Sequence, residues 1–222
     1  MNPEFWRQRW AENQIGFHQD APTPMLVEHW PSLGVAAGAK VFVPLAGKSL
    51  DMAWLAARGH RVLGVELSQL AVEAFFEENG LQPAVRETKY GRHYQAGGIE
   101  LVCGDAFGLD AGVLHDCDAV FDRAALIALP PELRRRYVHE LYAALPAGCR
   151  GLLVSLEYPR HERPGPPFPV PGDEVHALYG RDWDVDLLER RSIPPGHPGF
   201  VAGVSRLDTA AYALRRRRAG RD

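Results

Sequence analysis

One block of the sequence, VFVPLAGKSLDMAWLAARGHRVLGVELS at residues 41–68, restricts the possible folds more than any other. The block opens with an apolar run at 41–45, which predicts a buried strand. Residues 49–58 then place their apolar side chains at helical spacing and are followed by a glycine that favours the end of a helix. A second apolar run at 61–66 predicts another strand, and Ser68 is suited to cap the next helix. The block therefore predicts consecutive core strands joined by a helix.

The same alternation of strands and helices continues along the chain. Further strands are predicted at 99–103, 119–121, 150–158, 183–189 and 202–214, and helices near 24–30 and 131–145. Buried strands that alternate with amphipathic helices favour an α/β, doubly wound fold with a mostly parallel sheet covered on both faces. The last two strands are expected to pair as a hairpin. No internal repeat and no convincing second domain is visible, so we expect one domain over residues 1–222.

Composition excludes several classes of protein. A net charge of -3 argues against a general nucleic-acid binder. The first residues alternate charged and aromatic side chains and lack the apolar stretch of a signal peptide or membrane span. Three cysteines without metal-ligand spacing are expected to be buried thiols in a reducing compartment. We therefore expect a cytoplasmic protein without a membrane partner, and a monomer, because no heptad or apolar stripe indicates a dimer.

Candidate site residues follow the ends of predicted strands. In a doubly wound sheet the ligand binds beyond the carboxyl ends of the strands, at the switch point. Leu45 and Gly47 follow the first strand, and a glycine there lets the backbone approach a ligand closely. Glu66 ends the second strand, where its carboxylate is placed to accept hydrogen bonds from both hydroxyls of a ribose. A capping or solvated glutamate is the structural alternative.

Two further strand ends carry charged residues. Arg123 is placed to hold a carboxylate through two parallel hydrogen bonds or to stabilise an anionic acceptor, and a structural pair with Asp122 is the alternative. Asp105 is placed to accept a hydrogen bond from an adenine amino group, although capping of a turn is nearly as good an explanation. Arg134 to Arg136 are expected to form a solvated helix face.

Aromatic residues gather near the amino terminus, on a short helix that begins at Pro3. Trp6 and Trp10 lie about one helical turn apart, a spacing that more often indicates core packing. An indole face also attracts the positive charge of a sulfonium. Phe17 is placed to wall a flat acceptor, and the adjacent His18 is a candidate base or simply an exposed loop residue. Residues 159–171 contain six prolines and predict a stiff flap.

The combined motifs resemble the thiopurine S-methyltransferase family. The resemblance is carried by Phe5-Trp6 with Trp10, Phe17-His18, the block at 41–68, FDRAAL at 121–126 and PGPPFPVP at 164–171. It implies a class I methyltransferase fold, which has a seven-stranded sheet with an antiparallel last pair, here with an N-terminal helical lid. It also implies that Trp10, Leu45, Glu66 and Arg123 contact S-adenosylmethionine. The glycine-rich loop of the wider class is reduced to PLAGK, and residues 86–98 match no motif.

The function expected from this resemblance is methylation of a small aromatic or heterocyclic thiol, with selenium and tellurium compounds as further candidate acceptors. Phe17 and Phe168 are the expected acceptor-binding residues, and no metal is required. Because no buried His or Cys dyad is evident, we expect catalysis by proximity and electrostatics without a dedicated base. A nicotinamide-dependent oxidoreductase is the alternative enzyme, although GxGxxG is missing after the first strand. A non-enzymatic nucleotide-binding module is the other alternative.

Overall fold

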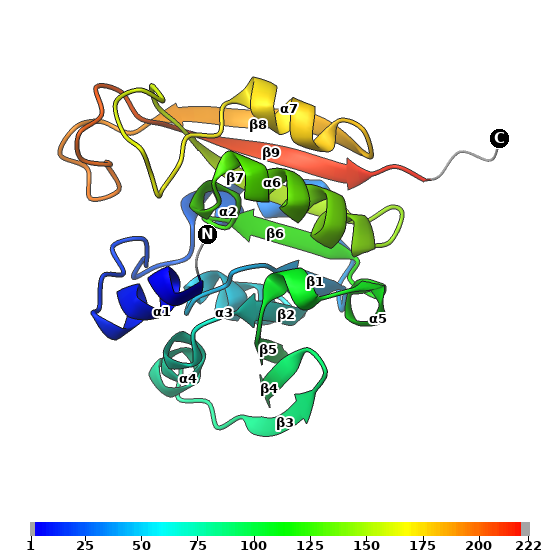
Figure 1. Ribbon diagram of the computed structural model, residues 1–222. Coiled ribbons are helices and arrows are strands. Elements are labelled where there is room, and N and C mark those ends of the chain that lie inside the picture. Colours follow the sequence, from blue (N-terminus) through cyan, green and yellow to red (C-terminus); the bar gives the residue numbers. More distant parts are fainter. Residues whose placement is uncertain (1–2, 219–222) are drawn as a thin grey trace.

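One mixed sheet runs through the protein, which is represented by a computed structural model that describes residues 3–218 (Figure 1). In spatial order its nine strands are β3 (Ala84–Thr88), β4 (Gly91–Ala96), β5 (Ile99–Cys103), β2 (Arg61–Glu66), β1 (Lys40–Val43), β6 (Ala119–Arg123), β7 (Arg150–Glu157), β9 (Asp208–Arg216) and β8 (Trp183–Ser192). The strands from β5 to β7 pair in parallel, and the pairs at both edges are antiparallel. The predicted α/β fold with an antiparallel last pair is therefore confirmed.

The sheet has nine strands where the resemblance implied seven, because β3 and β4 add a hairpin at one edge. This hairpin contains most of the segment 86–98, which had no assigned motif. No residue of β3 is buried, and in β4 only His93 and Tyr94 are. The hairpin thus lacks the apolar run that makes the core strands recognisable. The strand predicted at 202–214 begins only at Asp208.

Helices cover both faces of the sheet. They are α1 (Pro3–Ala11), α2 (Pro24–His29), α3 (Leu50–Ala56), α4 (Gln69–Glu78), α5 (Ala111–Leu114), α6 (Pro131–Arg136) and α7 (Gly172–Tyr179). Ser68 caps α4 as predicted, with its hydroxyl accepting from the Ala71 amide at 3.4 Å. The helix expected at 131–145 begins as α6 and changes hydrogen-bond pattern, to a π-helix at Tyr137–Leu141 and a short 3₁₀ turn at Tyr142–Ala144.

Alternate residues of the central strands enter two separate cores. In β1, Phe42 packs with α5, α6 and α7, whereas Val41 and Val43 pack with α2, α3 and α4. Because both faces are buried, the central strands are apolar runs without polar alternation. Helix α1 is the exception, since none of its residues is buried. The rings of Trp6 and Trp10 on this helix pack instead against Phe17 in the loop that follows.

The prediction of three buried thiols is confirmed for two of the cysteines and wrong for Cys103. Cys117 and Cys149 are buried, and Cys103 is partly exposed at the end of β5. Burial raises the pKa of Cys117 to about 12, so its thiol stays protonated near neutral pH. Within residues 3–218, no helix is both long enough and apolar enough to cross a membrane.

Candidate active site

Backbone strain is concentrated at one end of the parallel strands. Three non-glycine residues of the described chain have positive φ: Asn13 at 54°, Leu45 at 47° and Ala124 at 68°. Leu45 follows β1 and Ala124 follows β6, two strands that are neighbours in the sheet. Such strained positions often occur at binding sites, where the surrounding structure holds them in place. Figure 1 shows α1 and the loops after β7 and β8 at this same end of the sheet.

Glu66 ties the ends of β1 and β2 together. Its Oε2 accepts from the Gly47 amide at 2.9 Å, and its Oε1 accepts from the Ser68 amide at 2.8 Å. Burial raises the pKa of this carboxyl group, and the two amide hydrogen bonds partly oppose that effect. Each carboxylate oxygen has a second lone pair for a ligand hydroxyl. The geometry is therefore compatible with the ribose-binding role predicted for Glu66, while the capping role is also present.

Asp105 lies beside Glu66 in the adjoining strand connection. The last residue of β5, Cys103, pairs with Glu66, and the Gly104 amide donates to the Glu66 carbonyl at 3.0 Å. The carboxylate of Asp105 accepts from the Phe107 amide at 2.9 Å and so caps the short turn that follows. The capping alternative is thus seen in the structure, and an adenine contact stays a prediction.

Arg123 ends β6 with its side chain directed toward the amino-terminal loop. Its Nη1 donates to the Phe17 carbonyl at 3.0 Å, a contact between residues 106 positions apart in the chain. Burial lowers the pKa of this guanidinium, while the negative charge of Asp51 raises it. An arginine keeps its charge under such conditions, so the site contains a fixed, partly desolvated cation.

The amino-terminal aromatics fold over the turn after β1. The ring of Phe17 packs edge-on against Trp10 at 5.6 Å and against Trp6 at 5.8 Å between centroids. A methyl group added at Gly47 would meet the Trp10 ring at 3.1 Å, and Gly47 also has a φ of +54°. Glycine is therefore required both by the turn and by the indole above it. These contacts bring Trp10, Phe17, Gly47, Glu66 and Arg123 into one continuous set.

Asp51 is a site-supporting residue that sequence reasoning missed. It is 2% exposed and accepts from both the Thr23 amide at 2.7 Å and the Thr23 hydroxyl at 2.9 Å. The loop between Phe17 and Thr23 is thus fixed to the beginning of α3. No signal in the sequence indicated this role, because an acidic residue is common in the first turn of a helix and the burial of Asp51 appears only in the structure.

The proline-rich segment 159–171 is held against the turn after β6. The Phe168 amide donates to the Ile127 carbonyl at 2.7 Å, and the Val170 amide donates to the Leu156 carbonyl at 2.7 Å. Phe168 therefore lies next to the chain that follows Arg123.

The expectation that residues 134–136 form a solvated helix face is wrong for Arg134. Its side chain is 1% exposed, because backbone carbonyls and the Glu174 carboxylate surround the guanidinium.

Two other parts of the described chain contain side chains of the kinds that act as bases or metal ligands. Burial and the nearby positive charge of Lys48 lower the pKa of His18, so this side chain is neutral near pH 7.

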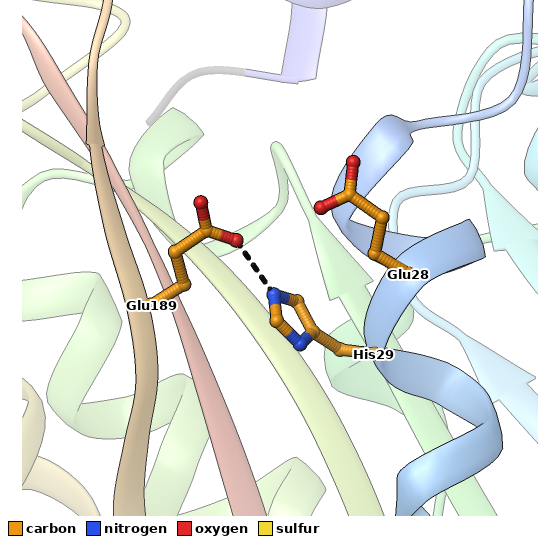
Figure 2. Close-up of side chains that lie close together, drawn as sticks. All are labelled: Glu28, His29 and Glu189. Atoms are coloured by element: carbon orange, nitrogen blue, oxygen red, sulfur yellow. Dashed lines mark hydrogen bonds and ion pairs between the residues drawn. The ribbon is translucent and has the colours of Figure 1, made fainter.

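One group of potential metal ligands lies close together among the described residues. It consists of Glu28, His29 and Glu189 (Figure 2). Arg191 already donates to both carboxylates of that group, at 2.7 and 2.8 Å, and Glu189 is hydrogen-bonded to His29. This arrangement is an ion-paired surface cluster between α2 and β8.

Comparison with known proteins decides the family. A family model for thiopurine S-methyltransferase matches residues 1–217. The chain belongs to the thiopurine S-methyltransferase family. A thiopurine S-methyltransferase of Nitrosomonas eutropha is 58% identical over 217 residues, which cover 97% of this chain and 99% of that protein. One from Xanthomonas campestris pv. campestris is 57% identical over 97% of this chain and 100% of its own length.

Solved structures support the fold of this thiopurine S-methyltransferase family member. The 1,6-didemethyltoxoflavin-N1-methyltransferase of Burkholderia thailandensis, solved with S-adenosylhomocysteine, has a TM-score of 0.67 at 16% identity, and the match covers 97% of this chain and 87% of that one. Such a likeness bears on the fold alone. Family membership confirms an S-adenosylmethionine-dependent methyltransferase, and the oxidoreductase and non-enzymatic alternatives were wrong.

Proposed function

We propose that this enzyme transfers the methyl group of S-adenosylmethionine to the sulfur of a small aromatic or heterocyclic thiol, and that selenium and tellurium compounds are further acceptors. The observation that carries the proposal is the set of contacts around the strand ends. Glu66 ends β2 and Arg123 ends β6, the two strands on either side of β1. Phe17 contacts both Arg123 and the tryptophan that lies above Gly47. The relatives' printed name, thiopurine S-methyltransferase, supports the choice of a sulfur acceptor.

We place the cofactor on the Glu66 side of this site. Glu66 would accept from the ribose hydroxyls, and Asp105 on the neighbouring connection would accept from the adenine amino group. The chain at Leu45 would lie against the nucleoside. Trp10 would face the sulfonium, whose positive charge is attracted to the electron-rich face of an indole. Helix α1 would thus act as a lid over the methyl donor.

We place the acceptor between Phe17 and Phe168, beside Arg123. Both aromatic residues are linked to the β6 end, one through the Arg123 side chain and the other through the Ile127 carbonyl. Flat rings would stack on these side chains with offset or edge-on geometry. The guanidinium of Arg123 would lower the pKa of a neighbouring thiol and so favour the reactive thiolate.

The chain's own contribution to the reaction is positioning and charge. S-adenosylmethionine would supply an activated methyl group. A thiolate held in line would form a bond to the methyl carbon as the bond from that carbon to the sulfonium sulfur breaks, and the neutral thioether S-adenosylhomocysteine would leave. Arg123 holds the anionic acceptor, and Trp10 with the N-terminal lid excludes water from the reacting atoms. The thiol proton passes to solvent before transfer, so no residue is assigned as a base.

An acceptor panel with labelled S-adenosylmethionine tests the proposed function. Heterocyclic thiols, selenite-derived selenols and tellurium compounds would be compared with matched alcohols and amines. We expect label on the sulfur of heterocyclic thiols. We also expect His18→Ala to methylate these thiols at an unchanged rate, apart from small effects on binding. Transfer to amines or alcohols alone would contradict it. Loss of turnover in His18→Ala with cofactor still bound would show that a base is required.

We also infer one domain and a monomer. The sheet is continuous from β3 at one edge to β8 at the other, and both cores lie directly on it. A single cooperative unfolding transition and a mass of one chain by light scattering are the expected results. Two separated transitions, or the mass of a dimer, would contradict them.

A further inference from the structure

A buried arginine lies behind the acceptor side of the proposed site and is not used by the mechanism above. The side chain of Arg134 on α6 donates from Nε to the Leu129 carbonyl at 2.7 Å and from Nη1 to the Pro169 carbonyl at 3.3 Å. Leu129 ends the turn that follows Arg123, and Pro169 directly follows Phe168. One guanidinium therefore fixes the segment that carries Phe168, one wall of the proposed acceptor site, to the turn that follows Arg123.

Glu174 on α7 completes this connection. Its Oε1 accepts from Nη1 of Arg134 at 2.5 Å, and its Oε2 pairs with Arg160. Arg160 belongs to the beginning of the proline-rich segment 159–171, whereas Pro169 belongs to its end. The carboxylate thus neutralises the buried guanidinium and also holds the near end of the segment. An unpaired charge would be costly at the position of Arg134, so this pairing is needed for the arginine to stay inside.

The position of Phe168 depends on the same contacts. Its ring lies 5.6 Å from the guanidinium carbon of Arg134, within the range of a cation–π contact. A methyl group at Gly165 would meet that ring at 2.4 Å, so the segment also packs closely around it. Three contacts therefore hold Phe168 in place: close packing against Gly165, the hydrogen bond to the Pro169 carbonyl, and the buried guanidinium beside its ring. Its ring has a defined place relative to the turn after β6.

We propose that Arg134 and Glu174 are positioning residues that fix Phe168 and thereby set the distance between the two walls of the acceptor site. The proposal rests on the proposed function for the nature of the acceptor. Neither residue contacts the cofactor side, where Glu66 and Gly47 are tied to each other independently. The pair therefore governs acceptor affinity and selectivity, and cofactor affinity does not depend on it.

The planar fork of arginine is required for this role. A lysine at 134 keeps the charge but has one nitrogen and cannot reach the Leu129 and Pro169 carbonyls and the Glu174 carboxylate from separate, fixed directions. We expect Arg134→Lys to leave the fold intact while releasing the proline-rich segment. Glu174→Gln keeps the shape of the side chain and removes the charge that holds Arg134 and Arg160.

The test compares Arg134→Lys and Glu174→Gln with Arg135→Lys, a control at the next residue, which is exposed. The first measurement is the KM for a heterocyclic thiol and the dissociation constant of S-adenosylhomocysteine by calorimetry. We expect the acceptor KM to rise about 10- to 100-fold in the two test variants, because displacement of a positioning group by about 1 Å has effects of this size. Cofactor affinity is expected to change less than about twofold.

The second measurement is independent of activity. Trypsin can cut after Arg160, while the Arg163–Pro164 bond resists it, so the rate at which fragment 1–160 appears reports release of the segment. We expect faster cleavage in Arg134→Lys and Glu174→Gln and an unchanged rate in Arg135→Lys. An unchanged acceptor KM and cleavage rate would overturn the proposal. A parallel fall in acceptor affinity, cofactor affinity and thermal stability would also overturn it, since that pattern indicates a general structural role.

The two measurements separate this proposal from the proposed function. If the native enzyme methylates no thiol, the proposed function fails, and the trypsin rates still show whether Arg134 and Glu174 hold the segment. If thiol methylation is robust and the KM of bulky and compact thiols changes equally in the test variants, the positioning of Phe168 does not set selectivity. We expect bulky thiols to be less affected than compact ones, because a released Phe168 widens the site.

Discussion

The cofactor side and the acceptor side of the site are built in different ways. On the cofactor side, Glu66 contacts the Gly47 amide across 19 residues, between the ends of two adjacent parallel strands. On the acceptor side, Arg123 reaches Phe17 across 106 residues, and Arg134 reaches Glu174 across 40. The sheet itself creates the first set of contacts. The second set needs side chains that join distant loops, so the acceptor side is the part that a few substitutions can change without altering the fold.

The largest effect is expected on the cofactor side, from Glu66→Ala. The variant loses the hydrogen bonds proposed for the ribose, and hydrogen bonds to a charged group contribute about 1.5–3 kcal/mol each. The dissociation constant of S-adenosylhomocysteine should therefore rise about 100-fold or more. Calorimetry measures this directly, with circular dichroism as the check that the sheet is intact. Unchanged affinity would remove Glu66 from the site.

Arg123→Met should have the next largest effect, on the acceptor side. The variant removes the cation proposed to stabilise the thiolate, and removal of one such stabilising group typically lowers turnover about 100-fold. It also frees the Phe17 carbonyl. We expect kcat/KM to fall by about that factor and hydrogen exchange to increase at residues 12–20. If turnover fell without any change in exchange, Arg123 would not hold the amino-terminal loop.

The pH dependence of cofactor binding should reflect the raised pKa of Glu66. The ionised form accepts from two hydroxyls, so affinity should fall as pH decreases through a midpoint above the ordinary value of 4.5. Below the midpoint the fall should approach about tenfold per pH unit, as for linkage to one proton. The stability of the ligand-free protein should change with pH in the opposite direction. Because the pKa of Glu66 is higher in the folded protein than in the unfolded chain, the free energy of unfolding decreases as pH rises through the folded-state pKa.

Calorimetry over a pH range that extends from below the ordinary glutamate value to pH 8 checks this dependence, with Glu66→Gln as the control. Glu66→Gln should bind the cofactor weakly, and its affinity should show no pH dependence from the side chain at position 66. A midpoint at or below the ordinary glutamate value, or a dependence that survives in Glu66→Gln, would assign the titration to another residue.

The smallest effect is expected for Trp10→Leu. A cation–π contact of this kind contributes about 0.5–1 kcal/mol at an exposed site, or about 2- to 5-fold in affinity. S-adenosylhomocysteine has no sulfonium charge and provides the internal control. The variant should weaken binding of S-adenosylmethionine more than binding of S-adenosylhomocysteine. An equal loss for both would show that Trp10 acts only by packing against Gly47 and Phe17.

The difference between the two sides also explains what the sequence could predict. Strands β2 and β5 begin and end at the predicted residues, because continuous apolar runs mark strands buried on both faces. The β3–β4 hairpin was not predicted, since its residues are mostly exposed and show no apolar run. Glu66 and Arg123 were identifiable as charges at the ends of apolar strands, a signal that lies within a few residues of sequence.

The tertiary contacts of the acceptor side left no such local signal. Arg134 belongs to a run of three arginines, and its burial depends on Glu174 and on carbonyls of two other segments. Asp51 looks like an ordinary first-turn aspartate until Thr23 is placed beside it. In both cases the partner is determined by the fold and not by the neighbouring sequence. Long-range ties of this kind become visible only in three dimensions.

The most direct test of the proposed site is a crystal structure of the enzyme with S-adenosylhomocysteine and a heterocyclic thiol. We expect ribose hydroxyls on Glu66, the cofactor sulfur below Trp10, and the thiol between Phe17 and Phe168 within reach of Arg123. A nucleoside bound elsewhere, or a thiol on the far side of the cofactor from Arg123, would contradict it.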